Sequence, residues 1–142
     1  MFSKACEYGI RAMIHIAHKS QIKERVGVKA IAKAIDSPEA FTGKIMQQLS
    51  KSGLVQSIKG PHGGFWINDD DRVKINLRQI VEVLDGDQIY VGCGLGLSQC
   101  NDSQPCPMHN QFTPVRQALI KIHTETSLDE LATKLDGIAT LK

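Results

Sequence analysis

The sequence predicts a mainly α-helical protein with one small β-hairpin. Two short helical patterns meet at a tight turn, Asp36-Ser37-Pro38, and a glycine-rich hairpin pattern follows them directly. Helical periodicity returns in the second half, after an irregular loop that holds three of the four cysteines. These observations together predict a winged helix-turn-helix followed by a C-terminal dimerisation helix.

Length and composition narrow the class of protein. The 142 residues suit one compact domain, or a small domain with an appended helix. Hydrophobic residues make up 42% of the chain, which is enough for a core and argues against disorder. No apolar run is long enough to span a membrane, and charges interrupt the N-terminal segment, unlike a signal peptide. A cytoplasmic protein is therefore expected.

The charges are divided unevenly along the chain. Residues 1–67 contain ten Lys or Arg and four Asp or Glu, a net charge of +6. Residues 68–142 contain seven Lys or Arg and eleven Asp or Glu, a net charge of −4. A basic half joined to an acidic half favours contact between the basic half and a polyanion, although incidental unevenness of loop charges would look the same.

The first predicted helix covers about residues 2–19. Its small and apolar residues recur at steps of three and four, which predicts one buried stripe: Ala5, Tyr8, Gly9, Ala12, Met13, Ile16 and Ala17. Cys6 is interpreted as a small buried helix residue, and His15 and His18 as solvated histidines.

A helix-turn-helix pattern occupies residues 28–51. Its first helix is predicted by apolar residues at helical spacing: Val28, Ile31, Ala32 and Ile35. Pro38 cannot continue that helix but suits the first turn of the next one, for which Ser37 is the expected N-cap. The second helix, residues 38–51, is expected to stop at Gly53 and to bury three side chains: Phe41, Ile45 and Leu49.

Two short strands are predicted next, at residues 54–59 and 65–68. The turn between them is Lys59-Gly60-Pro61-His62-Gly63-Gly64, whose glycines permit positive φ and a close approach to another surface. Lys59 and His62 place hydrogen-bond donors at its tip. A hairpin directly after a helix-turn-helix is typical of the wing of a winged helix; an ordinary glycine-rich loop is the alternative.

The second half contains three further helical patterns. Asp69-Asp70-Asp71 is interpreted as a solvated junction, before a helix at 77–86 capped by Asn76 and ended by Gly86. Residues 87–109 show no periodicity. Two more helices follow, one outlined by Val115, Leu119 and Ile122 with Pro114 at its start or in a kink, the other begun by a Ser127–Glu130 capping box. An exposed amphipathic helix beyond a winged helix predicts a symmetric homodimer.

The irregular loop carries the pattern Cys93-x6-Cys100-x5-Cys106-x2-His109. Thiolates suit zinc, copper(I) and iron–sulfur clusters, and an imidazole can complete the ligand set. Gaps of six and five do not match the short knuckles of structural zinc sites, so the spacing favours an iron–sulfur centre over zinc. A reactive disulfide pair is a further possibility.

Taken together, these motifs resemble the IscR/NsrR family of iron–sulfur-dependent, winged-helix bacterial transcription regulators over nearly the whole chain. The segments that carry the resemblance are Tyr8-Gly9-Ile10-Arg11-Ala12, the turn before Phe41, Leu49-Ser50-Lys51-Ser52-Gly53-Leu54-Val55, Lys59-Gly60-Pro61-His62-Gly63-Gly64-Phe65, the three-cysteine loop and Ser127-Leu128-Asp129-Glu130-Leu131. The resemblance implies a dimeric repressor that binds a palindromic operator in double-stranded DNA. It also implies sensing of redox state, nitric oxide or iron–sulfur status.

The resemblance further implies that Cys93, Cys100 and Cys106 hold a [2Fe–2S] or [4Fe–4S] cluster. His109 is the expected fourth ligand of a [2Fe–2S] cluster, and Glu7, supplied across the dimer, is the alternative for a [4Fe–4S] cluster. We favour His109 and [2Fe–2S], because an imidazole in the same loop needs no second chain. The first cysteine gap is six residues where family members commonly have five. Gly43 also replaces a side chain that discriminates operators in the IscR type, so the operator sequence is not assigned.

The DNA contacts follow from the same arrangement. The helix at 38–51 is expected to enter the major groove and the hairpin tip to reach the minor groove or backbone, through Thr42, Lys44, Gln47, Lys59, Pro61 and His62. A merely solvated helix face is the alternative for Lys44 and Gln47. Residues 1–70 would then form the DNA-binding domain, and 71–142 the cluster-binding loop and dimerisation helices.

Other classes of function remain as alternatives. A zinc- or thiol-regulated winged-helix DNA binder has the same fold, and an iron–sulfur carrier or adaptor would not bind DNA. An enzyme is not expected, because no nucleophile–base pair, phosphate loop or acid pair stands out. His123 and its neighbouring carboxylates are interpreted as helix surface.

Overall fold

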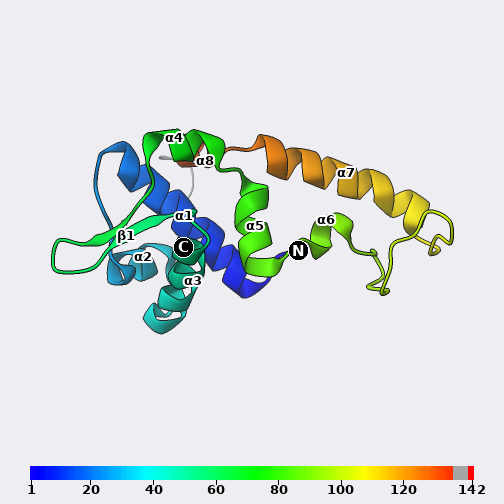
Figure 1. The fold of residues 1–142 in the computed structure, drawn as a ribbon, viewed down its shortest axis with the longest axis horizontal. Helices are drawn as coiled ribbons and strands as arrows, with labels where there is room; N and C mark the ends of the chain where they lie inside the picture. Colours follow the sequence, from blue (N-terminus) through cyan, green and yellow to red (C-terminus); the bar gives the residue numbers. More distant parts are fainter. Residues whose placement is uncertain (136–140) are drawn as a thin grey trace.

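The computed structural model describes residues 1–135 and 141–142 of the chain. The elements in chain order (Figure 1) are α1 (Lys4–Gln21), α2 (Val28–Ile35), α3 (Glu39–Lys51), β1 (Gln56–Ile58), β2 (Gly64–Trp66), α4 (Asp69–Lys74), α5 (Leu77–Asp85), α6 (Gln88–Val91), α7 (His109–Glu125) and α8 (Leu128–Lys134). In the described residues a two-stranded antiparallel sheet accompanies these helices. The predicted fold class, mainly helical with a small hairpin, is confirmed.

Helix α1 is the centre of the fold, because α2, α3, α5 and α8 all pack against it. The interior of its predicted stripe is confirmed: Ala12, Met13, Ile16 and Ala17 are fully buried. Gly9 lets α5 approach closely, since a Cβ at this position would lie 2.1 Å from Cδ1 of Leu84. Cys6 is also fully buried, as predicted, and burial raises the pKa of its thiol to about 12.

Helices α2 and α3 form the predicted helix-turn-helix. Asp36 ends α2 in the left-handed region, with φ of 54°. Pro38 is the N-cap of α3, so the expectation that Ser37 caps this helix is wrong. The Ser37 hydroxyl instead hydrogen-bonds to the hydroxyl of Thr42 inside the first turn.

Strands β1 and β2 form the predicted hairpin, with Ser57 opposite Phe65 in the register. Phe65 also bridges to Val26, through two backbone hydrogen bonds of 2.8 and 3.1 Å. The base of the hairpin is therefore attached to the segment that leads into α2. At the tip, the Gly63 N–H donates to the Gly60 carbonyl at 3.0 Å, and a Cβ on Gly63 would lie 2.0 Å from the Ile58 carbonyl oxygen.

Two short helices were not predicted. The three aspartates at 69–71, interpreted as a solvated junction, occupy the first turn of α4, where negative charge is favoured by the helix dipole. Helix α6 lies within the stretch at 87–109 that was expected to be irregular. The neighbouring prediction for α5 is confirmed, because Asn76 and Gln79 form a capping box and Gly86 is the C-cap.

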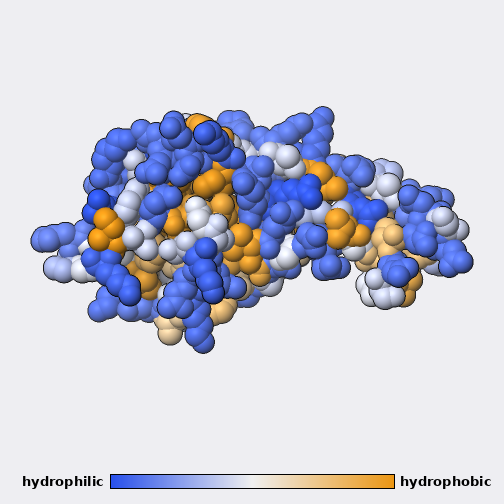
Figure 2. All heavy atoms as spheres, in the orientation of Figure 1, coloured by the Kyte–Doolittle hydropathy of each residue, from blue (hydrophilic) through white to orange (hydrophobic). Residues whose placement is uncertain are grey.

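Helix α7 projects from the body as a long arm, and the loop between α6 and α7 lies at its far end (Figure 1). Pro114 lies inside α7, which begins upstream at His109. Figure 2 shows hydrophobic side chains along this arm, interrupted by hydrophilic ones. Val115 and Ile122 of α7 are 57% and 58% exposed. Among the described residues, no helix combines the length and apolar character that crossing a membrane requires.

Candidate DNA-binding surface and cysteine loop

Helix α3 presents a polar face to solvent and an apolar face to the core. Lys44 and Gln47 are exposed, as a DNA-contacting face requires. Thr42 is fully buried, and its hydroxyl donates to the Pro38 carbonyl at 2.8 Å. The prediction that Thr42 contacts DNA is therefore wrong, because its side chain is used to hold the first turn of α3.

A groove of about 430 Å³ lies between α3 and the hairpin. Gln47 lines it from the helix and Lys59 from the hairpin, so the structure brings these two predicted residues to one surface. The Ser50 and Ser57 hydroxyls lie 3.2 Å apart and link α3 to β1 beside the groove. Lys51 also lines the groove and is exposed. Sequence reasoning did not assign Lys51 a role, although its place at the end of the helix before the hairpin was a usable signal.

The hairpin tip is open to solvent. Lys59, Pro61 and His62 are all exposed. Pro61 and His62 lie within the tight turn closed between Gly60 and Gly63, and Lys59 lies directly after β1. The hairpin tip and α3 can therefore contact the same bound molecule, which is the arrangement that a wing requires.

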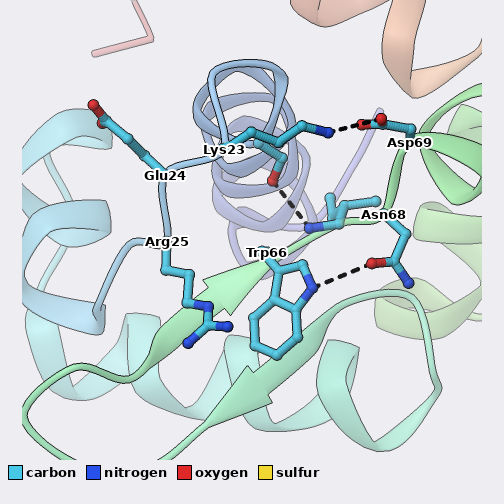
Figure 3. A pocket seen from close by; sticks show the side chains of 8 residues that line it. Lys23, Glu24, Arg25, Trp66, Asn68 and Asp69 are labelled. Atoms are coloured by element: carbon cyan, nitrogen blue, oxygen red, sulfur yellow. Dashed lines mark hydrogen bonds and ion pairs between the residues drawn. The ribbon is translucent and has the colours of Figure 1, made fainter.

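A second pocket, of about 340 Å³, lies at the base of the hairpin (Figure 3). The Arg25 guanidinium lies over the Trp66 ring, 4.6 Å from its centroid, and the indole N–H donates to Asn68 at 3.2 Å. Lys23 pairs with Asp69 at 2.8 Å across the same pocket. The contacts of Arg25 and Lys23 join the α1–α2 loop to the end of β2 and to the start of α4, so the pocket lies where these segments are held together. Sequence reasoning did not single out Arg25.

The loop at the tip of the arm arranges the four predicted ligands in two pairs. Sγ of Cys93 lies 3.8 Å from Sγ of Cys106, and Sγ of Cys100 lies 3.6 Å from Nδ1 of His109. The three thiols are half-buried and unbonded, and His109 is 9% exposed. Across residues 1–135 and 141–142, no three His, Cys, Asp or Glu side chains converge on one point that could hold a metal ion.

Each pair has a separation that suits one tetrahedral metal ion. Two sulfurs bound to the same tetrahedral metal ion, each at about 2.3 Å, lie about 3.8 Å from each other. A sulfur and an imidazole nitrogen bound to the same ion lie about 3.6 Å from each other. The separations in the loop match these values. Each pair could supply two ligands to one metal ion, so the chemistry of the donor set is compatible with a group that contains two metal ions.

The surroundings of the loop also favour thiolate chemistry. Backbone N–H groups of Leu95 and Leu97 lower the pKa of Cys93 below its usual value. Arg116 of α7 donates from Nη1 to Sγ of Cys100 at 3.2 Å. Glu7, the alternative ligand, lies on a different element, α1, where its carboxylate pairs with Lys4 at 3.4 Å.

A buried polar contact lies at the other end of the arm. His123 was interpreted as helix surface, but it is 3% exposed, and that interpretation is wrong. The reason is α6, which the sequence did not predict: its Tyr90 is buried against α7 and places its hydroxyl 2.7 Å from Nδ1 of His123.

Comparison with known proteins identifies the family of the chain. The family model described as Rrf2, iron-dependent transcriptional regulator, matches residues 2–134. A protein of Aquifex aeolicus named as an HTH-type transcriptional regulator is 31% identical over 134 residues, covering 92% of this chain and 90% of the relative. The HTH-type transcriptional regulator NsrR of Oceanobacillus iheyensis is 26% identical over 129 residues, which cover 90% of this chain and 86% of NsrR.

The fold is also found in a solved structure. The structure of CymR, the global cysteine regulator of Bacillus subtilis, matches with a TM-score of 0.77 at 24% identity, covering 94% of this chain and 97% of CymR. At this identity the likeness shows the fold, and it confirms the winged-helix architecture. The family model spans nearly the whole chain, so the resemblance noted from the sequence motifs is confirmed. The chain belongs to the Rrf2 family of transcriptional regulators.

Proposed function

We propose that this regulator is a homodimer whose affinity for a palindromic operator depends on a [2Fe–2S] cluster held by Cys93, Cys100, Cys106 and His109. The observation that carries this proposal is the two-by-two arrangement of the ligands, at 3.8 and 3.6 Å. A [2Fe–2S] cluster contains two iron ions, and each takes two protein ligands. The same arrangement favours [2Fe–2S] over [4Fe–4S] and His109 over Glu7.

The DNA-binding part is assigned to residues 1–70. Helix α3 enters the major groove with Lys44 and Gln47, while Lys59, Pro61 and His62 of the hairpin contact the neighbouring minor groove or backbone. The groove shared by Gln47 and Lys59 supports this assignment, because it places helix and hairpin side chains on one surface. The net charge of +6 over residues 1–67 supplies the attraction to phosphates.

Residues 71–142 are assigned to the cluster and to dimerisation. The exposed Val115 and Ile122 lie one above the other along α7, seven residues and two turns apart, so they form an apolar face on the arm. A second copy of α7 would bury this face. Two copies of α3 would then be held at a spacing that must match half-sites about 34 Å apart, one turn of DNA.

The contacts of α7 connect the loop to this spacing. Arg116 ties the helix to Cys100 and to the Gly92 carbonyl at 2.8 Å. At its other end α7 leads into α8, which packs on α1 of the DNA-binding part. When bound, the cluster supplies a redox-sensitive link between the two ligand pairs. Loss, oxidation or nitrosylation of the cluster would remove this link, and Arg116 would pass a movement of the loop to α7 and so to the distance between the two recognition helices.

The test is to purify the full chain without oxygen and to measure iron, sulfide and visible absorption. We expect about two iron ions and two sulfides per chain, with thiolate-to-iron absorption. Cys106→Ser should lose the cluster, whereas Cys6→Ser, at a buried cysteine outside the loop, should keep it. A colourless protein with neither iron nor sulfide after reconstitution would contradict the proposal.

A second candidate is a winged-helix DNA binder regulated by zinc or by its thiols. The 3.8 Å contact between Cys93 and Cys106 favours it, because two adjacent thiols can bind one zinc ion or form a disulfide. Metal analysis separates the two functions: this candidate predicts zinc or no metal, together with operator binding that responds to thiol oxidants.

A further inference from the structure

The two ligand pairs of the cysteine loop have different surroundings. The Cys93–Cys106 pair receives a backbone N–H, from Leu95 to Sγ of Cys93 at 3.4 Å. The Cys100–His109 pair is contacted instead by two charged side chains of opposite sign, Asp102 and Arg116. A guanidinium has no lone pair to give a metal ion, and Oδ1 of Asp102 is engaged by His109, so each side chain acts through the ligand that it contacts.

We propose that Asp102 and Arg116 are positioning residues for the Cys100–His109 pair. Both residues slow the loss of the cluster, and they shift its reduction potential in opposite directions. This inference rests on the proposed function, since it concerns the same cluster. It assigns roles to two residues that do not belong to the ligand pattern.

Asp102 determines which nitrogen of His109 faces the metal. Its Oδ1 lies 2.6 Å from Nε2 of the imidazole, while Nδ1 faces Sγ of Cys100 at 3.6 Å. A carboxylate can only accept here, so Nε2 carries the hydrogen and the lone pair of Nδ1 is left for a metal. The carboxylate also makes the imidazole a stronger electron donor, which disfavours reduction of the bound iron.

Arg116 acts on the sulfur of the same pair. Its Nη1 donates to Sγ of Cys100 at 3.2 Å and to the Gly92 carbonyl at 2.8 Å. Because Gly92 directly precedes Cys93, this one guanidinium holds the two ligand pairs in register. Its positive charge beside a thiolate stabilises added negative charge, so it favours reduction. Arg116 lies seven residues after His109 on α7, two turns along one face, so both contacts come from a single helix.

The test compares Asp102→Asn, Arg116→Gln and Arg116→Lys in the anaerobically purified full chain. Two quantities are measured: the midpoint potential of the cluster, and the rate at which an iron chelator removes it. Lys121→Gln is the matched control, because it removes one positive charge from the same helix at an exposed position away from the loop.

Asp102→Asn is expected to raise the midpoint potential and Arg116→Gln to lower it, with chelation about tenfold faster in both. Arg116→Lys restores the charge and should return the potential toward the wild-type value, while Lys121→Gln leaves both quantities unchanged. Asp102 has an exposed side chain, so its replacement reports on the site without disturbing the core.

Two results would overturn the inference and leave the proposed function standing. In the first, the wild-type chain holds a cluster but the variants keep its potential and chelation rate. In the second, both variants shift the potential in the same direction, which is the behaviour of residues that only stabilise the loop. A wild-type chain that holds no cluster would overturn both this inference and the proposed function.

Discussion

The hydroxyl of Tyr90 lies 2.7 Å from Nδ1 of His123, in a position where both side chains are almost completely buried. The contact joins α6 to α7, and Phe2, just before α1, lies against the same imidazole with ring centroids 5.5 Å apart. The arm that carries the cysteine loop is therefore anchored to the body through a histidine. Burial lowers the pKa of His123 below its ordinary value, so the folded chain favours the neutral imidazole.

This anchor predicts a pH-dependent stability. Between the lowered pKa in the folded chain and the ordinary value of 6.5, the unfolded chain binds more protons. The free energy of unfolding should therefore be highest above about pH 6.5 and fall as the pH drops through the folded pKa. Urea unfolding at about pH 7.5 and about pH 5.5 measures the difference.

The contribution of His123 can be separated from that of other histidines. Burial lowers the pKa of His15 as well, so part of the pH dependence should remain in any single variant. His123→Gln keeps an acceptor for Tyr90 and should reduce the pH dependence, because it removes the buried titrating group. Equal pH dependence in His123→Gln and the wild-type chain would contradict the burial argument.

Thr42 is predicted to matter for stability and not for base recognition. Thr42→Val removes the hydroxyl bonded to Pro38 and Ser37 without changing the size of the side chain. It should lower the free energy of unfolding by about 1 kcal/mol and leave the preferred operator unchanged. Lys44→Ala, on the exposed face of the same helix, should leave the free energy of unfolding unchanged and alter the preferred operator. Urea unfolding and operator selection from a random duplex pool give the two readouts, and altered base preference in Thr42→Val would refute this assignment.

Lys59 is predicted to contact a phosphate from the hairpin. Lys59→Ala should weaken binding to all duplexes and reduce the slope of log affinity against log salt concentration by about 1. Fluorescence anisotropy at several salt concentrations measures this slope. Lys134→Ala, on α8, is the control and should keep the wild-type slope; equal slopes in all three proteins would exclude the contact.

The apolar face of α7 is predicted to form the dimer. Val115→Glu and Ile122→Glu should each raise the dimer dissociation constant by on the order of tenfold or more, because each buries a charge in the interface. Sedimentation analysis measures this constant. Ile22→Glu changes an equally exposed apolar residue, 59% exposed and outside the arm, and should remain dimeric. A dimer unaffected by both α7 variants would place the interface elsewhere.

The helices of the first half could be predicted because their apolar residues repeat regularly. Helix α6 could not, since it has four residues and no period of its own. The burial of His123 depends on α6, so it was missed for the same reason. Thr42 is different: it lies at i of an i, i+3, i+4, i+7 stripe completed by Ile45, Met46 and Leu49, and a stricter use of that spacing would have placed it inside.

The cysteine loop shows where sequence reasoning ends. Its pattern identified all four ligand candidates, because thiols and an imidazole so close together are a chemical signal. The pairing of Cys93 with Cys106 could not be predicted, since a loop without periodicity does not reveal which residues meet. The contacts of Asp102 and Arg116 depend on how the loop folds back on α7, and no local pattern encodes them.

In the proposed function, the cluster controls operator binding. The most direct test of this control is to measure operator affinity by fluorescence anisotropy on one anaerobic preparation, before and after removal of the cluster, with Cys106→Ser treated in parallel. We predict that removal changes the wild-type affinity by about tenfold or more, while Cys106→Ser binds like the cluster-free protein throughout. Equal affinity of the loaded and cluster-free wild-type protein would contradict the account.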